Sequence, residues 1–161
     1  MKIVLSPSKT KTITTVDNNG AVHTAVQDGQ FQPHITQNLV KHVQSLDVAA
    51  LGKALKLKDD KAQAFFDFYQ DFKSHPVGLA CESYDGIAFK YLDWQNLSDE
   101  AKAFGESHLV VMSALYGVVE PMMGVRDYRL DMVDKVGINL YDTWREAVDA
   151  YFHKEDWIRS E

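Results

Sequence analysis

A short apolar run in the second half of the chain limits the possible folds more than any other segment. Residues His108 to Ala114 read His-Leu-Val-Val-Met-Ser-Ala and are rich in valine. Strands buried on both faces of a sheet have this near-continuous apolar pattern. The run therefore predicts a central strand. Helical patterns lie on both sides of it in the sequence, so we expect an α/β protein in which helices surround a mixed sheet.

Apolar spacing and capping residues predict the helices. The first has apolar residues at steps of three and four, namely Ile35, Leu39, Val43 and Leu46. Asp47 is a good N-cap for a second helix, and Asp59 or Asp60 can cap a third. Ser98 and Asn139 are N-caps for two later helices. The third helix carries an aromatic stripe with the spacing of a buried face, which we assign to the core: Phe65, Phe66, Tyr69 and Phe72.

Shorter segments predict the remaining strands and one long loop. Lys2 to Ser6 indicates a short buried strand, and Val77 to Cys81 and Tyr128 to Met132 indicate two more. The polar stretch from Lys11 to Gln32 contains Asn-Gly and Asp-Gly turn signals. We expect a loop there, with a hairpin through residues 21–26.

Size and composition are those of an ordinary globular domain. The chain has 161 residues, 45% hydrophobic and 25% charged, and we expect one domain over residues 1–161. The apolar start, Met1 to Pro7, is too short for a signal peptide. The stretch from Leu109 to Val119 falls short of the ~18 residues of a membrane helix. We therefore expect a soluble, cytoplasmic protein, and its single cysteine, Cys81, excludes an internal disulfide.

The charge balance weighs against a nucleic-acid partner without excluding one. Seventeen Lys and Arg against 23 Asp and Glu give a net charge of -6. Affinity for phosphates comes from concentrated cations. A local basic cleft can persist on an acidic protein, because exposed charges are screened over about 8–10 Å.

The segment Ser6-Pro7-Ser8-Lys9-Thr10 follows the first predicted strand. Lys9 as a point charge, with Ser8 or Thr10 as donors, could hold an anion there. The segment has no glycines, so it is not a Walker-type phosphate loop. A solvated turn is the alternative interpretation.

Four lysines surround the turn between the second and third predicted helices: Lys53, Lys56, Lys58 and Lys61. Two short helices around a basic turn resemble a helix-hairpin-helix element, which contacts the DNA backbone and gives affinity without reading sequence. The usual Gly-hydrophobic-Gly turn is absent, and Asp59 and Asp60 partly cancel the lysines. A solvated charged turn is the alternative here.

The densest group of functional side chains lies between Met112 and Met132. A predicted strand leads into a loop with Gly and Pro, a location that ligand sites in α/β proteins favour. The loop carries Tyr116, Glu120, Arg126, Tyr128, Arg129 and Asp131. Arg126 and Arg129 could fork onto phosphates, or they could form a network with Asp127 or Asp131 that fixes the loop. The six histidines lack metal-ligand spacing, so we expect no metal and no cofactor.

Taken in order, these segments resemble the YaaA family of peroxide-stress proteins. Ile3 to Thr10 is similar to the family's start, where Ser-Pro-Ala-Lys-Thr is usual. Ser113 to Pro121 and Tyr128 to Met132 are close to its Ser-Gly-Leu-Tyr-Gly and Pro-Tyr-Arg-Leu-Glu-Met signatures. Tyr84 to Gly86 looks like its Gly-x-x-Tyr/Phe segment, and Asn139 to Trp144 matches its Leu-Tyr-x-x-Trp helix start.

The chain also departs from the family pattern. Ala114 and Asp127 replace the common Gly and Pro, and Glu120 stands where some members carry Arg. Family members continue well beyond Glu161 into a lysine-rich part. We therefore expect the domain to be incomplete at its C-terminal end.

The resemblance implies a cytoplasmic protein that limits oxidative damage under hydrogen peroxide and binds DNA through a positively charged cleft. In our first hypothesis the protein is not an enzyme, and it binds double- or single-stranded DNA without sequence preference. The four lysines of the turn and a cleft would hold the DNA, the cleft comprising Ser6, Lys9, Thr10, Tyr116, Arg126, Tyr128, Arg129 and Asp131.

Two alternatives remain open. The second hypothesis is an enzyme acting on a nucleotide or nucleobase in a pocket between Ser6–Thr10 and Tyr116–Arg129. Arg129 would hold a phosphate, and Asp131 or Glu120 would act as the base. The third is a protein-interaction module. The sequence does not specify an oligomeric state.

Overall fold

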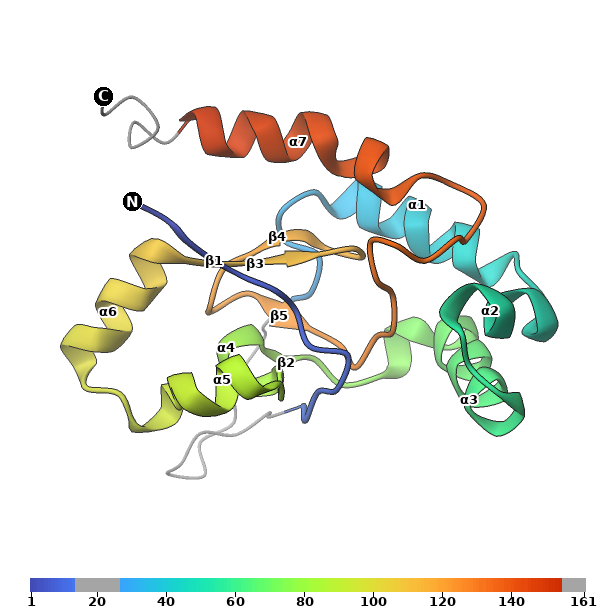
Figure 1. The fold of residues 1–161 in the computed structure, drawn as a ribbon, viewed down its shortest axis with the longest axis horizontal. Helices are drawn as coiled ribbons and strands as arrows, with labels where there is room; N and C mark the ends of the chain where they lie inside the picture. The colour runs from blue at the N-terminus through green and yellow to red at the C-terminus, as the bar shows by residue number, and fades with distance from the viewer. Residues whose placement is uncertain (14–26, 155–161) are drawn as a thin grey trace.

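The computed structural model describes residues 1–13 and 27–154, and it has helices packed around a mixed sheet (Figure 1). The sheet has three strands in the order β1 (Ile3–Leu5), β3 (Leu109–Ser113) and β4 (Gly117–Val119). β1 is parallel to β3, and β4 is antiparallel to it. A second, two-stranded sheet joins β2 (Gly78–Leu79) to β5 (Gly124–Val125) in antiparallel fashion. The predicted α/β class and central strand are confirmed.

Helices cover both sides of the strands. α7 and α1 lie on one side in Figure 1, and α4 and α5 lie on the other. α6 stands at one end of the molecule, and the pair α2 and α3 stands at the opposite end. The helices are α1 (Pro33–Gln44), α2 (Val48–Leu55), α3 (Asp59–Gln70), α4 (Ala80–Ser83), α5 (Ile87–Leu92), α6 (Asp99–His108) and α7 (Leu140–Lys154).

Three predicted N-caps are confirmed by their hydrogen bonds. Asp47 accepts from the Ala50 amide at 2.7 Å, which satisfies a donor that the helix leaves unpaired. Ser98 and Asn139 do the same for α6 and α7, at 3.1 Å each. The cap predicted for α3 is wrong. Lys58 precedes that helix without a side-chain cap, and the two aspartates occupy its first turn, where the helix dipole favours acids.

The core surrounds the three-stranded sheet and includes buried residues from α1, α2, α3 and α7. Val110 and Val118 are fully buried, and Trp144 of α7 is 1% exposed. The indole Nε1 of Trp144 donates to the Ala114 carbonyl at 2.7 Å, which joins the last helix to the end of β3. Most of the aromatic stripe of α3 lies in this core as predicted, with Tyr69 fully buried.

The strand predictions need three corrections. β1 is a strand but not a buried one, because it lies at the sheet edge and leaves Val4 52% exposed. Tyr128 to Met132 is irregular, and the strands β4 and β5 come from the stretch predicted to be a loop. Val77 to Cys81 is divided between β2 and α4. Two further expectations concern the loop and the membrane. The hairpin predicted at 21–26 lies outside the described residues. No described helix is long and apolar enough to cross a membrane.

Candidate functional site

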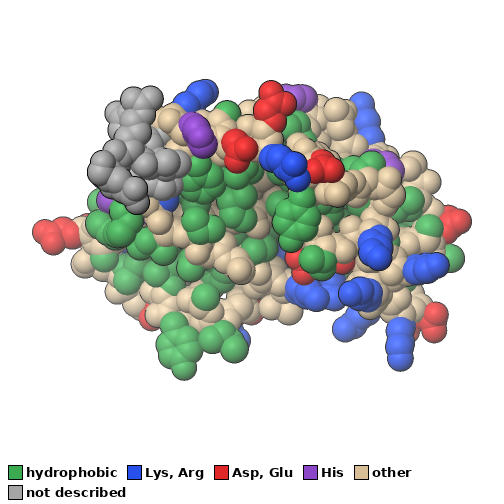
Figure 2. Space-filling view, turned by 45° about the horizontal axis from the view of Figure 1, so that its top comes forward, with side chains coloured by type: hydrophobic (Ala, Val, Ile, Leu, Met, Phe, Trp, Pro, Cys, Tyr) green, Lys and Arg blue, Asp and Glu red, His purple; other side chains and the backbone are tan. Residues whose placement is uncertain are grey.

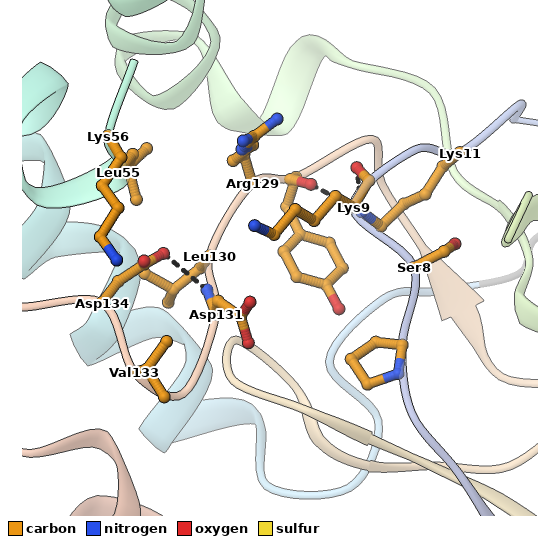
Figure 3. Close-up of a pocket in the computed structure, with 12 residues that line it drawn as sticks. Ser8, Lys9, Lys11, Leu55, Lys56, Arg129, Leu130, Asp131, Val133 and Asp134 are labelled. Atoms are coloured by element: carbon orange, nitrogen blue, oxygen red, sulfur yellow. Dashed lines mark hydrogen bonds between the residues drawn. The ribbon is translucent and has the colours of Figure 1, made fainter.

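A small cavity of about 170 Å³ lies where three segments meet (Figure 3). The loop after β1 contributes Ser8, Lys9 and Lys11, and the end of α2 contributes Lys56. The irregular segment from Tyr128 to Asp134 forms the remaining wall. We call this cavity the cationic pocket. It joins two stretches that the sequence singled out, the Ser-Pro-Ser-Lys-Thr segment and the Arg129 motif, to the lysine-rich turn.

Three cations of this pocket have no partner within the described chain. No hydrogen bond or ion pair joins the ammonium of Lys9 or Lys56, or the guanidinium of Arg129, to another residue in ranges 1–13 and 27–154. Figure 3 shows that the three side chains come from three different segments around the cavity. Unpaired cations that converge on one cavity favour an anionic ligand, above all one with several oxygens such as a phosphate.

Two acids at the rim are held by backbone amides of their own turn. Asp134 accepts from the Asp131 amide at 2.8 Å, and Asp131 accepts from the Met132 amide at 3.0 Å. Burial raises the pKa of Asp134, while the hydrogen bond from Asp131 and the charges of Lys9 and Arg129 lower it. Their carboxylates shape the rim and reduce the positive field, but they form no ion pair with the three cations.

Sequence reasoning missed two charged members of the pocket, Asp134 and Lys11. The Lys11 ammonium donates to the Tyr128 carbonyl at 2.7 Å and lies 4.1 Å from the centroid of the Tyr128 ring. Burial lowers the pKa of Lys11 to about 8, with Asp127 raising it and Arg129 lowering it further. The available signal was its spacing from Lys9, because alternate residues of an extended chain share a face.

A buried hydroxyl network fixes the segment that carries Arg129. The Ser113 hydroxyl at the end of β3 donates to the Tyr128 hydroxyl at 2.7 Å, and the Tyr84 hydroxyl lies 2.7 Å from the same oxygen. The Tyr69 hydroxyl of α3 donates to the Arg129 carbonyl at 2.7 Å. Burial raises the pKa of Tyr128 to about 12, so these phenols stay neutral donors. The pocket wall is therefore tied to both the sheet and α3.

Arg126 and Tyr116, which we predicted for the cleft, do not line the cationic pocket. Arg126 forms an ion pair with Asp28 and donates from Nε to the His75 carbonyl at 3.0 Å. The Tyr116 hydroxyl donates to Asp28 at 3.1 Å and accepts from the Arg126 amide at 3.1 Å. Arg126 belongs to an Arg–Asp network, as in the alternative that we weighed, but its acid is Asp28 and not the predicted Asp127 or Asp131.

The other predicted residues are distributed around the pocket. Ser6 lines a neighbouring groove that shares Asp131 with the pocket. The Thr10 hydroxyl donates to the Asp85 carbonyl at 3.1 Å and does not face the cavity. Glu120 lies outside the pocket, so Asp131 is the predicted base that lines it. Within the described ranges no group of three or more His, Cys, Asp and Glu side chains could hold a metal ion.

The lysine-rich turn extends the cationic pocket across the end of the molecule. α2 and α3 pack closely at Gly52, where an added Cβ would lie 2.9 Å from the Ala62 Cβ. Lys56 ends α2 in the left-handed conformation, with φ of 56°, and the chain reverses into α3. Figure 2 shows Lys and Arg side chains gathered at this end of the molecule. All four lysines of the turn are exposed: Lys53, Lys56, Lys58 and Lys61.

Fold and site together define a small α/β protein with a cationic pocket beside a lysine-rich helical turn. Residues 1–160 match the family described as Peroxide stress protein YaaA, and the chain belongs to that family. It is 32% identical over 158 residues to a UPF0246 protein of Finegoldia magna, covering 98% of this chain and 62% of the relative. A UPF0246 protein of Desulfitobacterium hafniense is 31% identical over 169 residues, with 97% and 62% covered. The chain thus spans less than two thirds of the length of these relatives.

Proposed function

We propose that this member of the peroxide-stress family binds DNA through its phosphate backbone, without sequence preference, and limits oxidative damage in that way. The observation that carries the proposal is the cationic pocket, where Lys9, Lys56 and Arg129 have no partner in the described chain. Lys56 belongs to both the pocket and the lysine-rich turn. When one DNA phosphate occupies the pocket, the adjacent phosphates of the same DNA strand can therefore contact the lysines of the turn. Contacts of this kind set affinity and position but carry no sequence information.

The acidic net charge does not prevent this binding. A phosphate at the pocket is affected mainly by charges within a Debye length, about 8–10 Å at moderate salt. Exposed acids also lie beside the lysines of the turn, since Asp59 and Asp60 begin α3. We therefore expect weak to moderate affinity at physiological salt and a steep gain as salt is lowered.

The test is a titration of a labelled duplex with the chain across a series of salt concentrations. We expect log affinity to fall linearly with log salt, and Lys56→Glu to weaken binding and reduce the slope by about 1. Lys154→Glu is the matched control, because it makes the same charge change on an exposed lysine at the end of α7, far from the turn (Figure 1). Absence of binding at low salt, or equal effects of the two changes, would contradict the proposal.

A nucleotide- or nucleobase-directed enzyme is the second proposal. It is favoured by the side chains that meet in one cavity: Arg129 to hold a phosphate, Asp131 as a base, and Lys11 with a pKa of about 8. Incubating the chain with nucleosides and nucleotides and separating the products by chromatography tests it. Turnover that disappears in Asp131→Asn while ligand binding persists would support an enzyme. No conversion of any of these compounds would contradict the enzyme proposal.

A further inference from the structure

A hollow of about 430 Å³ lies beside the cationic pocket, a volume within the range of small-molecule sites, roughly 300–1,000 Å³. Phe65 and Phe68 of α3 form one wall, and His75, Pro76, Ile13 and Asp127 complete it. We propose that this hollow takes an unpaired nucleobase, so that the protein prefers single-stranded DNA to duplex. The inference rests on the proposed function, because the phosphate of the same nucleotide would occupy the cationic pocket.

Two chain segments connect the hollow to the pocket. Lys11 lines the pocket and Ile13 lines the hollow, while Arg129 lines the pocket and Asp127 lines the hollow. Two residues of extended chain span at most about 7 Å. That is the scale of the separation between the phosphate and the base within one nucleotide. In the proposed complex one nucleotide places its phosphate in the pocket and its base in the hollow.

The wall on α3 offers aromatic surface to a base. Phe65 is half-buried, and its ring lies 6.1 Å from the ring of Phe68. The His75 ring lies 4.5 Å from Phe68 and extends the same surface. Stacking on aromatic side chains is tolerant of sequence, because every base has a π-face. Bases within a duplex are already stacked and paired, so only an unpaired base can enter.

Asp127 adds a polar group to this apolar hollow. Its carboxylate forms no hydrogen bond or ion pair with another residue of the described chain. A carboxylate accepts hydrogen bonds from an exocyclic amino group, such as that of cytosine, and thymine lacks such a group. Asp127 therefore predicts tighter binding of cytosine-containing than of thymine-containing single strands. We expect this preference for cytosine to contribute less to the affinity than the stacking of the base does.

The lysine-rich turn lies next to the hollow along α3. Lys61, Phe65 and Phe68 follow each other at steps of four and three residues, which places them on one face of the helix. Lys61 is exposed one turn before Phe65. A strand that places a base against Phe65 can therefore contact Lys61 through an adjacent phosphate.

The experiment compares a labelled single strand with the matched duplex for the wild type and three variants. Phe65→Ala should weaken single-strand binding by roughly 5- to 150-fold, the effect of losing one stacked base, and should leave duplex binding within about twofold. Phe66→Ala is the matched control, since Phe66 is also half-buried but does not line the hollow. Lys56→Glu should weaken both ligands, because it acts on the phosphates.

Asp127→Asn is a further variant that should leave the packing of the core intact, because Asp127 is exposed. It should reduce the ratio of oligocytidine to oligothymidine affinity, because a neutral amide oxygen is a weaker acceptor than a carboxylate. Equal losses in Phe65→Ala and Phe66→Ala, or an unchanged base preference in Asp127→Asn, would overturn the nucleobase site. If the tests of the nucleobase site fail in this way but Lys56→Glu still weakens the binding of both single strand and duplex, the proposal that the pocket binds phosphates remains supported. If wild type binds neither ligand at low salt, both proposals fail.

Discussion

At the scale of single residues, Ser113 connects the sheet to the wall of the cationic pocket. Its hydroxyl donates to Tyr128 and accepts from the amides of Leu115 and Tyr116 at 3.2 and 3.1 Å. Ser113→Ala would leave these buried groups short of a partner, so we expect a loss of about 1–3 kcal/mol in the free energy of unfolding, measured in urea. Ser107→Ala removes an exposed hydroxyl on α6 and should cost less than about 0.5 kcal/mol. A similar loss in both variants would contradict the role of the network.

Lys11 makes the free energy of unfolding depend on pH. Burial lowers its pKa from 10.5 in the unfolded chain to about 8 in the folded protein. The unfolded chain then binds more protons between these values, so stability rises with pH across that window. The cost of burying the charged ammonium is fully present below about pH 8. We expect wild type to gain stability relative to Lys11→Met between about pH 8 and pH 10, measured by urea denaturation. A constant difference across that window would show that the Lys11 pKa is not lowered.

The structure brings some of the predicted site residues together in the cationic pocket and leaves others outside it, and the reason is the range of their interactions. Lys9, Arg129 and Asp131 were found because they sit in motifs just after strands or in the segment that β3 leads into. Arg126 was misplaced because its ion-pair partner, Asp28, lies in a distant part of the sequence. Lys11 was missed because its lowered pKa comes from burial, which no single stretch of sequence shows.

At the scale of elements, the close approach of α2 and α3 positions the lysine-rich turn. Gly52→Ala would place a Cβ 2.9 Å from the Ala62 Cβ, and we expect a cost of about 1–3 kcal/mol in the free energy of unfolding. Ala62→Gly makes room for the new methyl group, so Gly52→Ala should cost less in that background. A double-mutant cycle in urea measures the coupling. Purely additive effects would mean that the two helices do not meet at this point.

The longer helices were predictable because their signals are local, whereas the short helices α4 and α5 and the short strands were not. An apolar face marks α1, a capping side chain marks α6, and both signals mark α2 and α7, each within one stretch of sequence. β2 and β5 have two residues each, too few to show any alternation. They form where Ala80 and Cys81 donate to the carbonyls of Met123 and Pro121, and those pairings depend on the tertiary fold.

At the scale of the whole molecule, Trp144 joins the last helix to the core. Its indole packs against Gly117, where φ is 73° and an added Cβ would lie 2.5 Å from the ring. It also stacks on Phe31, with ring centroids 6.2 Å apart. One packing centre therefore joins Phe31 just before α1, Gly117 at the start of β4 and Trp144 of α7, and its loss should affect all three segments.

Trp144→Ala tests whether this centre makes unfolding cooperative. We expect a loss of about 3–5 kcal/mol in the free energy of unfolding, a large share of the roughly 5–15 kcal/mol of a typical domain. Amide hydrogen exchange should show protection falling together in β3, α1 and α7 if the sheet and both helices unfold as one unit. Tyr141→Ala, one turn earlier on α7 and 56% exposed, should change stability by less than about 0.5 kcal/mol. Loss of protection in α7 alone would instead mean that the helix is a separate unit, and that the strands and the cationic pocket keep their structure without it.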